Sequence, residues 1–127
     1  MSKLVLIFLG SGFGGLLRYV LTGWVQKVGS GAFPFGTIIV NLLGCLLIGF
    51  LGAAFAGKLP LREELRVAIV VGFIGGFTTF SALEMQTFEL LKDGQYVSAA
   101  VNVGASVVLG LMAVWAGVRM AEGWLGA

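Results

Sequence analysis

Four long apolar stretches divide this chain of 127 residues, and they restrict it to folds that cross a membrane. Each approaches the roughly 20 residues that a helix needs to cross the hydrocarbon core of a bilayer. Inside lipid only helices and closed barrels satisfy every backbone hydrogen bond. We therefore predict an all-α membrane protein in which residues 1–127 form a single four-span transmembrane domain. The spans run approximately over Leu4 to Val25, Phe35 to Ala56, Leu65 to Leu91 and Tyr96 to Val118.

The composition agrees with a membrane protein and excludes several other classes. Hydrophobic residues make up 58% of the chain and charged residues only 11%, against about 25% charged residues in a typical soluble domain. A formal net charge of +2 is too small to argue for a nucleic-acid partner. The chain has no histidine and only one cysteine, Cys45, which we interpret as a packing residue. A zinc or haem site and a Ser-His-Asp triad therefore lack their residues, and we predict no enzymatic activity.

The positive charges give a weak signal for orientation. Four crossings place both termini on one side of the membrane, and the positive-inside rule assigns that side to the cytoplasm. The bias is modest, because Arg62 and Arg66 lie beside Glu63 and Glu64, and this leaves room for insertion in both orientations. The terminal side carries Lys3, Lys58, Arg62, Arg66 and Arg119, and the other side carries Lys27 and Lys92.

A polar, glycine-rich run, Gly72 to Ser81, interrupts the third apolar stretch. The adjacent glycines Gly75 and Gly76 lower its helix propensity. Hydrocarbon tolerates irregular backbone only where protein buries it or where it lines a cavity. Broken helices of this kind carry ion sites in membrane proteins. The run therefore predicts a broken third helix and a function in handling ions.

Other polar residues within the spans have two readings each. Arg18 either raises the local anion concentration or anchors a helix end by snorkelling. Thr37 and Asn41 lie four residues apart on one helix face, where Asn41 either donates to an anion or joins two helices. Glu84 either is buried and carries protons, or pairs with Arg18 or lies near the headgroups. The fourth span carries a similar stripe, composed of Ser98, Asn102, Ser106 and Gly110.

Small residues recur at intervals of four, a spacing that permits close approach of helices. Packing within one bundle explains part of this pattern. However, four thin helices enclose little space, so a permeation path favours a second copy, and a homodimer is the simplest closed assembly. The pairs are Gly52 and Ala56, Ala53 and Gly57, Ser106 and Gly110, and Ala113 and Gly117.

Three motifs lie in order on the first three spans: Gly15-Leu-Leu-Arg18-Tyr19, Pro34-Phe-Gly-Thr37-Ile-Ile-Val-Asn41-Leu-Leu-Gly44 and Gly72-Phe-Ile-Gly-Gly-Phe-Thr-Thr-Phe-Ser81. With them the chain resembles the Fluc (CrcB-type) fluoride channels over essentially its whole length. This resemblance implies an antiparallel, dual-topology homodimer in the cytoplasmic (inner) membrane, with two fluoride pores.

The resemblance also implies the roles of particular residues. The main-chain carbonyls of Gly75 and Thr78 would hold a structural Na⁺ on the dimer axis. Asn41 would be a donor in the pore, and Phe80 would turn its positive ring edge toward fluoride. Ser81 would belong to a row of hydroxyl groups beside Phe80. We further expect Arg18, Thr37, Thr79 and Ser106 to line the fluoride path.

The chain departs from the family pattern just after the third motif. Family members commonly have Thr-Phe where this chain has Ala82-Leu83, and a frequent Glu is replaced by Gln86. Leu83 offers apolar bulk without a ring edge, so we expect Phe80 to supply the only aromatic contact in this part of the motif.

The resemblance makes passive fluoride export the leading functional hypothesis, and the chain offers hydroxyl and amide donors that can replace the water around a small anion. The alternative is a proton-coupled exporter of small molecules, like the small multidrug resistance proteins. Those proteins rely on a glutamate in their first span, where this chain has no acidic residue. Glu84 would have to take that role.

Overall fold

The computed structural model describes residues 2–29, 31–57 and 59–126, and within these ranges four helical segments are long and apolar enough to cross a membrane. They are α1 (Lys3–Gly29), α2 (Phe35–Ala56), an interrupted third segment (Glu63–Lys92) and α6 (Tyr96–Leu125). The predicted all-α fold with four spans is confirmed. The second span has the predicted bounds, whereas α1 continues to Gly29 and α6 to Leu125.

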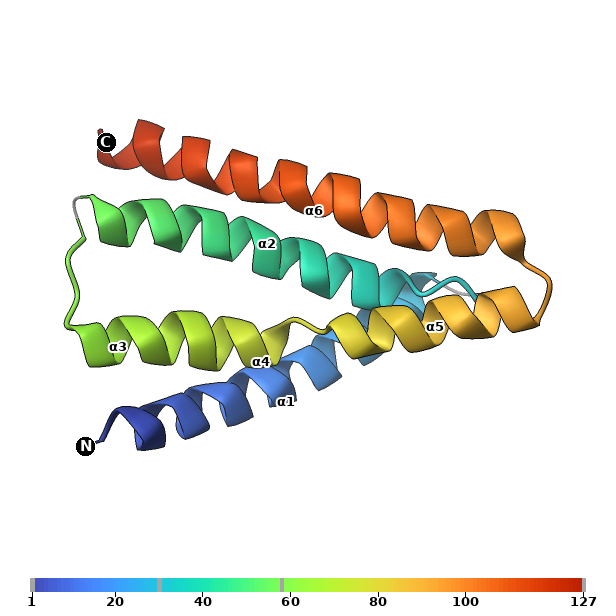
Figure 1. Ribbon diagram of the computed structural model, residues 1–127, viewed down its shortest axis with the longest axis horizontal. Helices are drawn as coiled ribbons and strands as arrows, with labels where there is room; N and C mark the ends of the chain where they lie inside the picture. The colour runs from blue at the N-terminus through green and yellow to red at the C-terminus, as the bar shows by residue number, and fades with distance from the viewer. Residues whose placement is uncertain (1, 30, 58, 127) are drawn as a thin grey trace.

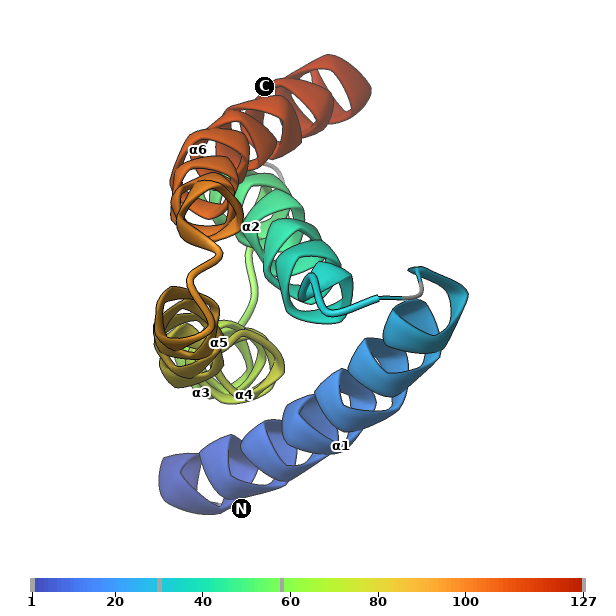
Figure 2. The same cartoon turned by 90° about the vertical axis from the view of Figure 1, so that its right-hand side faces the viewer.

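The spans alternate in direction, so the two termini lie at the same end of the molecule (Figure 1). The most extensive packing joins α2 to α6 and α1 to the third segment. Figure 2 shows α1 running obliquely past the other helices, on the side away from α6. At the terminal end, Lys3 Nζ lies 2.7 Å from Glu63 Oε1 and joins the start of α1 to the start of α3 (Glu63–Val67).

Glycines bring the backbones of α1 and the third segment into direct contact. A Cβ atom on Gly10 would lie 2.6 Å from the carbonyl oxygen of Ala68, and one on Gly72 would lie 3.0 Å from that of Ile7. Any larger residue would push the two backbones apart at these positions. The close approach therefore depends on glycine on both helices.

Glycines also decide the packing of α2 on α6. A Cβ on Gly117 would lie 2.7 Å from Phe50 N, and one on Gly49 would collide with the Val114 carbonyl. The predicted role of Gly117 in close packing agrees with this contact. Gly52, in contrast, has open space around its Cβ position, so the contact on α2 lies at Gly49 instead. Four-residue spacing alone does not reveal which face of a helix meets a neighbour.

The third segment changes its hydrogen-bonding pattern twice. It begins as α3, continues as a π-helix, η1 (Ala68–Ile74), and ends its first half in α4 (Gly75–Phe77). Thr78 and Thr79 are extended, with ψ angles of 159° and 121°, and α5 (Phe80–Lys92) follows them. The adjacent glycines are thus helical, and the two threonines carry the irregular backbone. Gly76 is used for packing, because a Cβ there would collide with the Ser11 carbonyl.

Two alanine substitutions on α2 test this packing. Gly49→Ala should destabilise the protein by about 1–3 kcal/mol, because the added methyl group collides with the α6 backbone. Gly52→Ala, three residues away, should leave stability unchanged or raise it by up to about 1 kcal/mol through better helix propensity. Thermal unfolding in detergent, followed by circular dichroism, measures both. Equal losses in the two variants would contradict the assigned contact.

Candidate functional site

The extended residues Thr78 and Thr79 interrupt the backbone hydrogen bonds of the third segment, and nearby groups replace part of them. The carbonyl of Ile74 accepts hydrogen bonds from the Thr78 amide (3.0 Å) and from Thr78 Oγ1 (3.1 Å). Thr79 Oγ1 accepts from the Ala82 amide at 3.2 Å and so caps the start of α5. Both threonine hydroxyls are therefore engaged with the backbone on either side of the interruption.

Asn41 on α2 binds Thr79 with both ends of its amide. Its Nδ2 donates to the Thr79 carbonyl at 2.9 Å, and its Oδ1 accepts from the Thr79 amide at 2.8 Å. This pairing requires one orientation of the Asn41 amide, because only that orientation matches donors with acceptors. The second N–H of Nδ2 remains available for another acceptor. Asn41 thus joins α2 to the extended segment.

Arg18 on α1 binds the last helical turn before the interruption. Its Nε donates to the carbonyl of Gly76 at 3.1 Å, one of the carbonyls that lose their helical partner where α4 ends. The guanidinium also lies at the C-terminal end of a helix, where the partial negative charge of the helix dipole favours a cation. Glu84 is exposed on α5, and no ion pair with Arg18 is found within the described residues.

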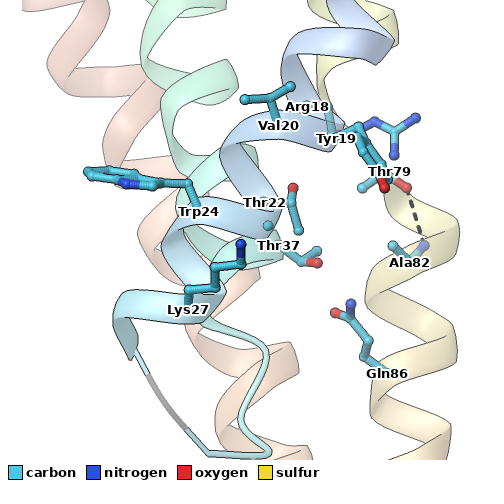
Figure 3. A pocket seen from close by; sticks show the side chains of 11 residues that line it. Arg18, Tyr19, Val20, Thr22, Trp24, Lys27, Thr37, Thr79, Ala82 and Gln86 are labelled. Atoms are coloured by element: carbon cyan, nitrogen blue, oxygen red, sulfur yellow. Dashed lines mark hydrogen bonds between the residues drawn. The ribbon is translucent and has the colours of Figure 1, made fainter.

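A first cavity of about 590 Å³ lies between α1, α2 and α5 (Figure 3). Its lining contains two cations, Arg18 and Lys27, and three threonine side chains. No carboxylate from the described residues lines it. The cavity therefore carries a positive potential and offers hydroxyl groups, a combination suited to anions. The lining residues are Arg18, Tyr19, Val20, Thr22, Gly23, Trp24, Lys27, Thr37, Thr79, Ala82 and Gln86.

A second cavity, of about 410 Å³, also adjoins Thr79 and is lined by α2, the third segment and α6. It brings together Asn41 from α2, Phe80 from α5 and Ser106 from α6. Ser106 Oγ is buried and has no hydrogen-bond partner among the described residues, so its hydroxyl is available to a bound species. The remaining lining comes from Gly44, Cys45, Ile48, Ile74, Thr78, Thr79, Leu83 and Val107.

The two cavities divide the residues that the sequence assigned to one path. Thr37 is 2% exposed and lines the first cavity, whereas Asn41, one turn along α2, lines the second. Thr79 lines both. Ser81 is exposed, and its Oγ lies 3.4 Å from Thr79 Oγ1. The predicted residues are therefore distributed over two cavities, and Thr79 borders both of them.

Phe80 and Leu83 differ sharply in their surroundings. Phe80 is 73% exposed, so most of its ring projects from the single copy. Leu83, one turn later, is only 6% exposed and packs within the protomer while bordering the second cavity. Truncating Leu83 would enlarge that cavity, so this side chain contributes packing as well as shape.

Three side chains at the first cavity were not predicted from the sequence. Thr22 follows Arg18 by four residues, so helical spacing could have placed them on one face. By sequence alone, Lys27 is a charge at a helix end. Gln86 is by sequence alone a departure from the family pattern, yet its Oε1 is buried without a partner among the described residues.

These features define the class of the protein: a multi-pass, all-helical membrane protein with two cavities that contain polar side chains beside an interrupted third segment. Residues 5–118 match the family described as CrcB-like protein, Camphor Resistance (CrcB), and the chain belongs to this family, which is also called Fluc.

Curated relatives are similar along nearly the whole chain. A protein of Nitratidesulfovibrio vulgaris is 42% identical over 93% of this chain and 95% of its own length. Proteins of Geobacter sulfurreducens (42% identical, 96% of this chain and 98% of the relative) and Pelobacter propionicus (48%, 86% and 84%) are further examples. All three carry the name fluoride-specific ion channel FluC, which describes channels rather than enzymes.

The contribution of Asn41 to the interruption can be measured. Asn41→Ala should lower the free energy of unfolding by about 2 kcal/mol, because the partly buried amide and carbonyl of Thr79 both lose their hydrogen-bond partner. Leu43→Ala on the same helix is the control, since Leu43 is 41% exposed. Unfolding in detergent compares the two variants, and an Asn41→Ala protein as stable as the control would contradict the two-point contact.

Proposed function

We propose that the chain is a fluoride-selective channel that exports F⁻ passively across the cytoplasmic (inner) membrane. The names of the relatives support fluoride as the permeating ion, and the two cations of the first cavity support an anion in general. One observation carries the proposal: a cavity with two cations and a cavity with amide and hydroxyl donors both adjoin Thr79, a residue of the interruption.

The chemistry of fluoride fits this sequence of groups. Fluoride is small and strongly hydrated, so a selective path must replace its water with closely spaced donors. In the proposed path, Arg18 and Lys27 raise the local anion concentration in the first cavity, where the hydroxyl of Thr37 is also available. Beyond Thr79, the free N–H of Asn41 and the unpartnered hydroxyl of Ser106 serve as donors.

Phe80 and Ser81 extend the proposed path at the surface of the protomer. The edge of an aromatic ring carries partial positive charge and attracts an anion without a formal charge. Phe80 is well suited to this contact because its ring is exposed rather than packed in the core. The Ser81 hydroxyl, close to that of Thr79, adds a donor at the same level.

We further propose that two copies assemble as an antiparallel homodimer with two pores. The exposure of Phe80 and Gly75 supports this assembly, since a single copy leaves part of the polar interruption uncovered. A second copy would cover these residues and complete the wall of the second cavity. The weak charge bias between the two sides is compatible with insertion in both orientations.

A structural Na⁺ fits the backbone at the proposed dimer axis. Helix α4 ends at Phe77, between Gly75 and Thr78. The carbonyls of Gly75 and Thr78 therefore accept no hydrogen bond from the residues that the structure describes. Unwound backbone carbonyls and half-helix C-termini are the groups that hold Na⁺ in broken membrane helices. Two copies would supply four such carbonyls around one ion.

Fluoride efflux from liposomes tests the function. We expect efflux that follows the electrical potential and is unaffected by an imposed pH gradient. Asn41→Asp should abolish the flux, because it replaces a donor with an anion-repelling carboxylate while keeping an acceptor for the Thr79 amide. Obligatory dependence on the proton gradient would instead indicate a coupled exporter, and normal flux in folded Asn41→Asp would remove Asn41 from the path.

Assembly and sodium can be tested together in detergent. We expect a dimer by light scattering, with a melting temperature that rises when Na⁺ replaces K⁺ or a large organic cation at equal ionic strength. Thr78→Ser, which preserves the main-chain carbonyl, should retain the Na⁺ effect. A monodisperse monomer that still transports fluoride would contradict the dimer, and equal melting temperatures in all cations would contradict the Na⁺ site.

A further inference from the structure

A polar connection joins α5 to α6 at a place that the interruption does not explain. Thr87 Oγ1 donates to the Leu83 carbonyl at 2.7 Å, and Asn102 Nδ2 donates to Thr87 Oγ1 at 2.9 Å. Asn102 is 0% exposed. The hydroxyl of Thr87 thus has both its proton and a lone pair engaged, so the three groups have a defined mutual orientation.

The register of the two helices relates this connection to the second cavity. The short turn after Lys92 makes α5 and α6 an antiparallel pair (Figure 1). One helical turn from Thr87 toward the interruption is Leu83, and one turn along α6 from Asn102 is Ser106. Leu83 and Ser106 both line the second cavity. The connection therefore lies one helical turn away from two residues that line this cavity, one on α5 and one on α6.

Burying the side-chain amide of Asn102 carries a free-energy cost that a purely stabilising contact would not need. Its Oδ1 is buried and has no hydrogen-bond partner among the described residues. An unsatisfied buried acceptor destabilises a protein, and an apolar pair of similar shape would avoid this cost. A hydrogen bond, however, is directional, whereas apolar side chains can slide past one another.

We propose that Asn102 is a positioning residue that holds Thr87, and through it α5, at one distance and rotation relative to α6. The inference rests on the proposed fluoride channel. The connection fixes the spacing between Leu83 on α5 and Ser106 on α6, so the second cavity stays narrow enough for donors to contact a fluoride ion from more than one side. Loosening the connection widens the cavity, which lowers fluoride flux and weakens the discrimination against the larger chloride ion.

Four variants separate positioning from stability. Thr87→Ser keeps the hydroxyl, and Thr87→Val removes it at nearly constant shape. The double variant Thr87→Val/Asn102→Leu replaces the polar pair with an apolar one. Ser98→Ala is the matched control, because Ser98 belongs to the same stripe of α6 and makes no side-chain hydrogen bond to a described residue. Each purified protein is assayed for its melting temperature and for fluoride and chloride efflux from liposomes.

We expect Thr87→Ser and Ser98→Ala to match the wild type in flux and selectivity. Thr87→Val should lower fluoride efflux by about threefold or more. Loss of one net hydrogen bond reduces the population of protein with the correct spacing of α5 and α6 by about this factor. The double variant should regain the wild-type melting temperature, yet its fluoride efflux and fluoride-to-chloride ratio should remain about threefold or more below wild type.

Recovery of flux and selectivity together with stability in the double variant would overturn the positioning role and leave Asn102 as a packing contact. Wild-type flux in Thr87→Val would overturn it as well. A wild-type protein that conducts no fluoride would overturn the proposed function and this inference with it. Failure of the positioning role and failure of the proposed function are distinguishable, because the positioning role can fail alone only if the wild-type protein conducts fluoride.

Discussion

Backbone hydrogen bonding at Thr78 and Thr79 is the constraint on which the rest of the structure depends. In hydrocarbon no water replaces the bonds that a helix loses where it is interrupted. Asn41 from α2 binds the amide and carbonyl of Thr79, and Arg18 from α1 binds the Gly76 carbonyl. Because these partners come from two different helices, the interruption can exist only where α1 and α2 lie beside the third segment.

The glycines make that arrangement possible. Gly10 and Gly72 allow the backbones of α1 and the third segment to touch, so Arg18 lies within reach of a main-chain carbonyl. The same contact involves the π-helical turns of η1. Such turns are rare and often occur at functional sites. Here they lie directly before the interruption and against α1, so packing and irregular backbone are parts of one arrangement.

Polar groups that remain without a partner connect this architecture to the proposed function. Ser106 Oγ and Gln86 Oε1 are buried without partners among the described residues, and the Gly75 and Thr78 carbonyls accept no hydrogen bond there. Buried polar groups are rarely left unsatisfied in a stable protein. In the proposed assembly the Ser106 hydroxyl would contact fluoride and the two carbonyls would hold Na⁺. The polar connection between Thr87 and Asn102 would then determine how closely the walls of the second cavity approach fluoride.

The sequence by itself determined the all-α membrane fold, the bounds of α2 and the kinds of polar group near the interruption, because length, hydropathy and residue chemistry are local properties. It did not reveal that Asn41 would bind both the main-chain amide and the main-chain carbonyl of Thr79, that Leu83 would be buried while Phe80 is exposed, or that Gly49 rather than Gly52 would meet α6. Those features depend on which helices are neighbours and on their rotation about their axes. A helix with small or polar residues on several faces is compatible with several such arrangements, and only the tertiary packing selects one.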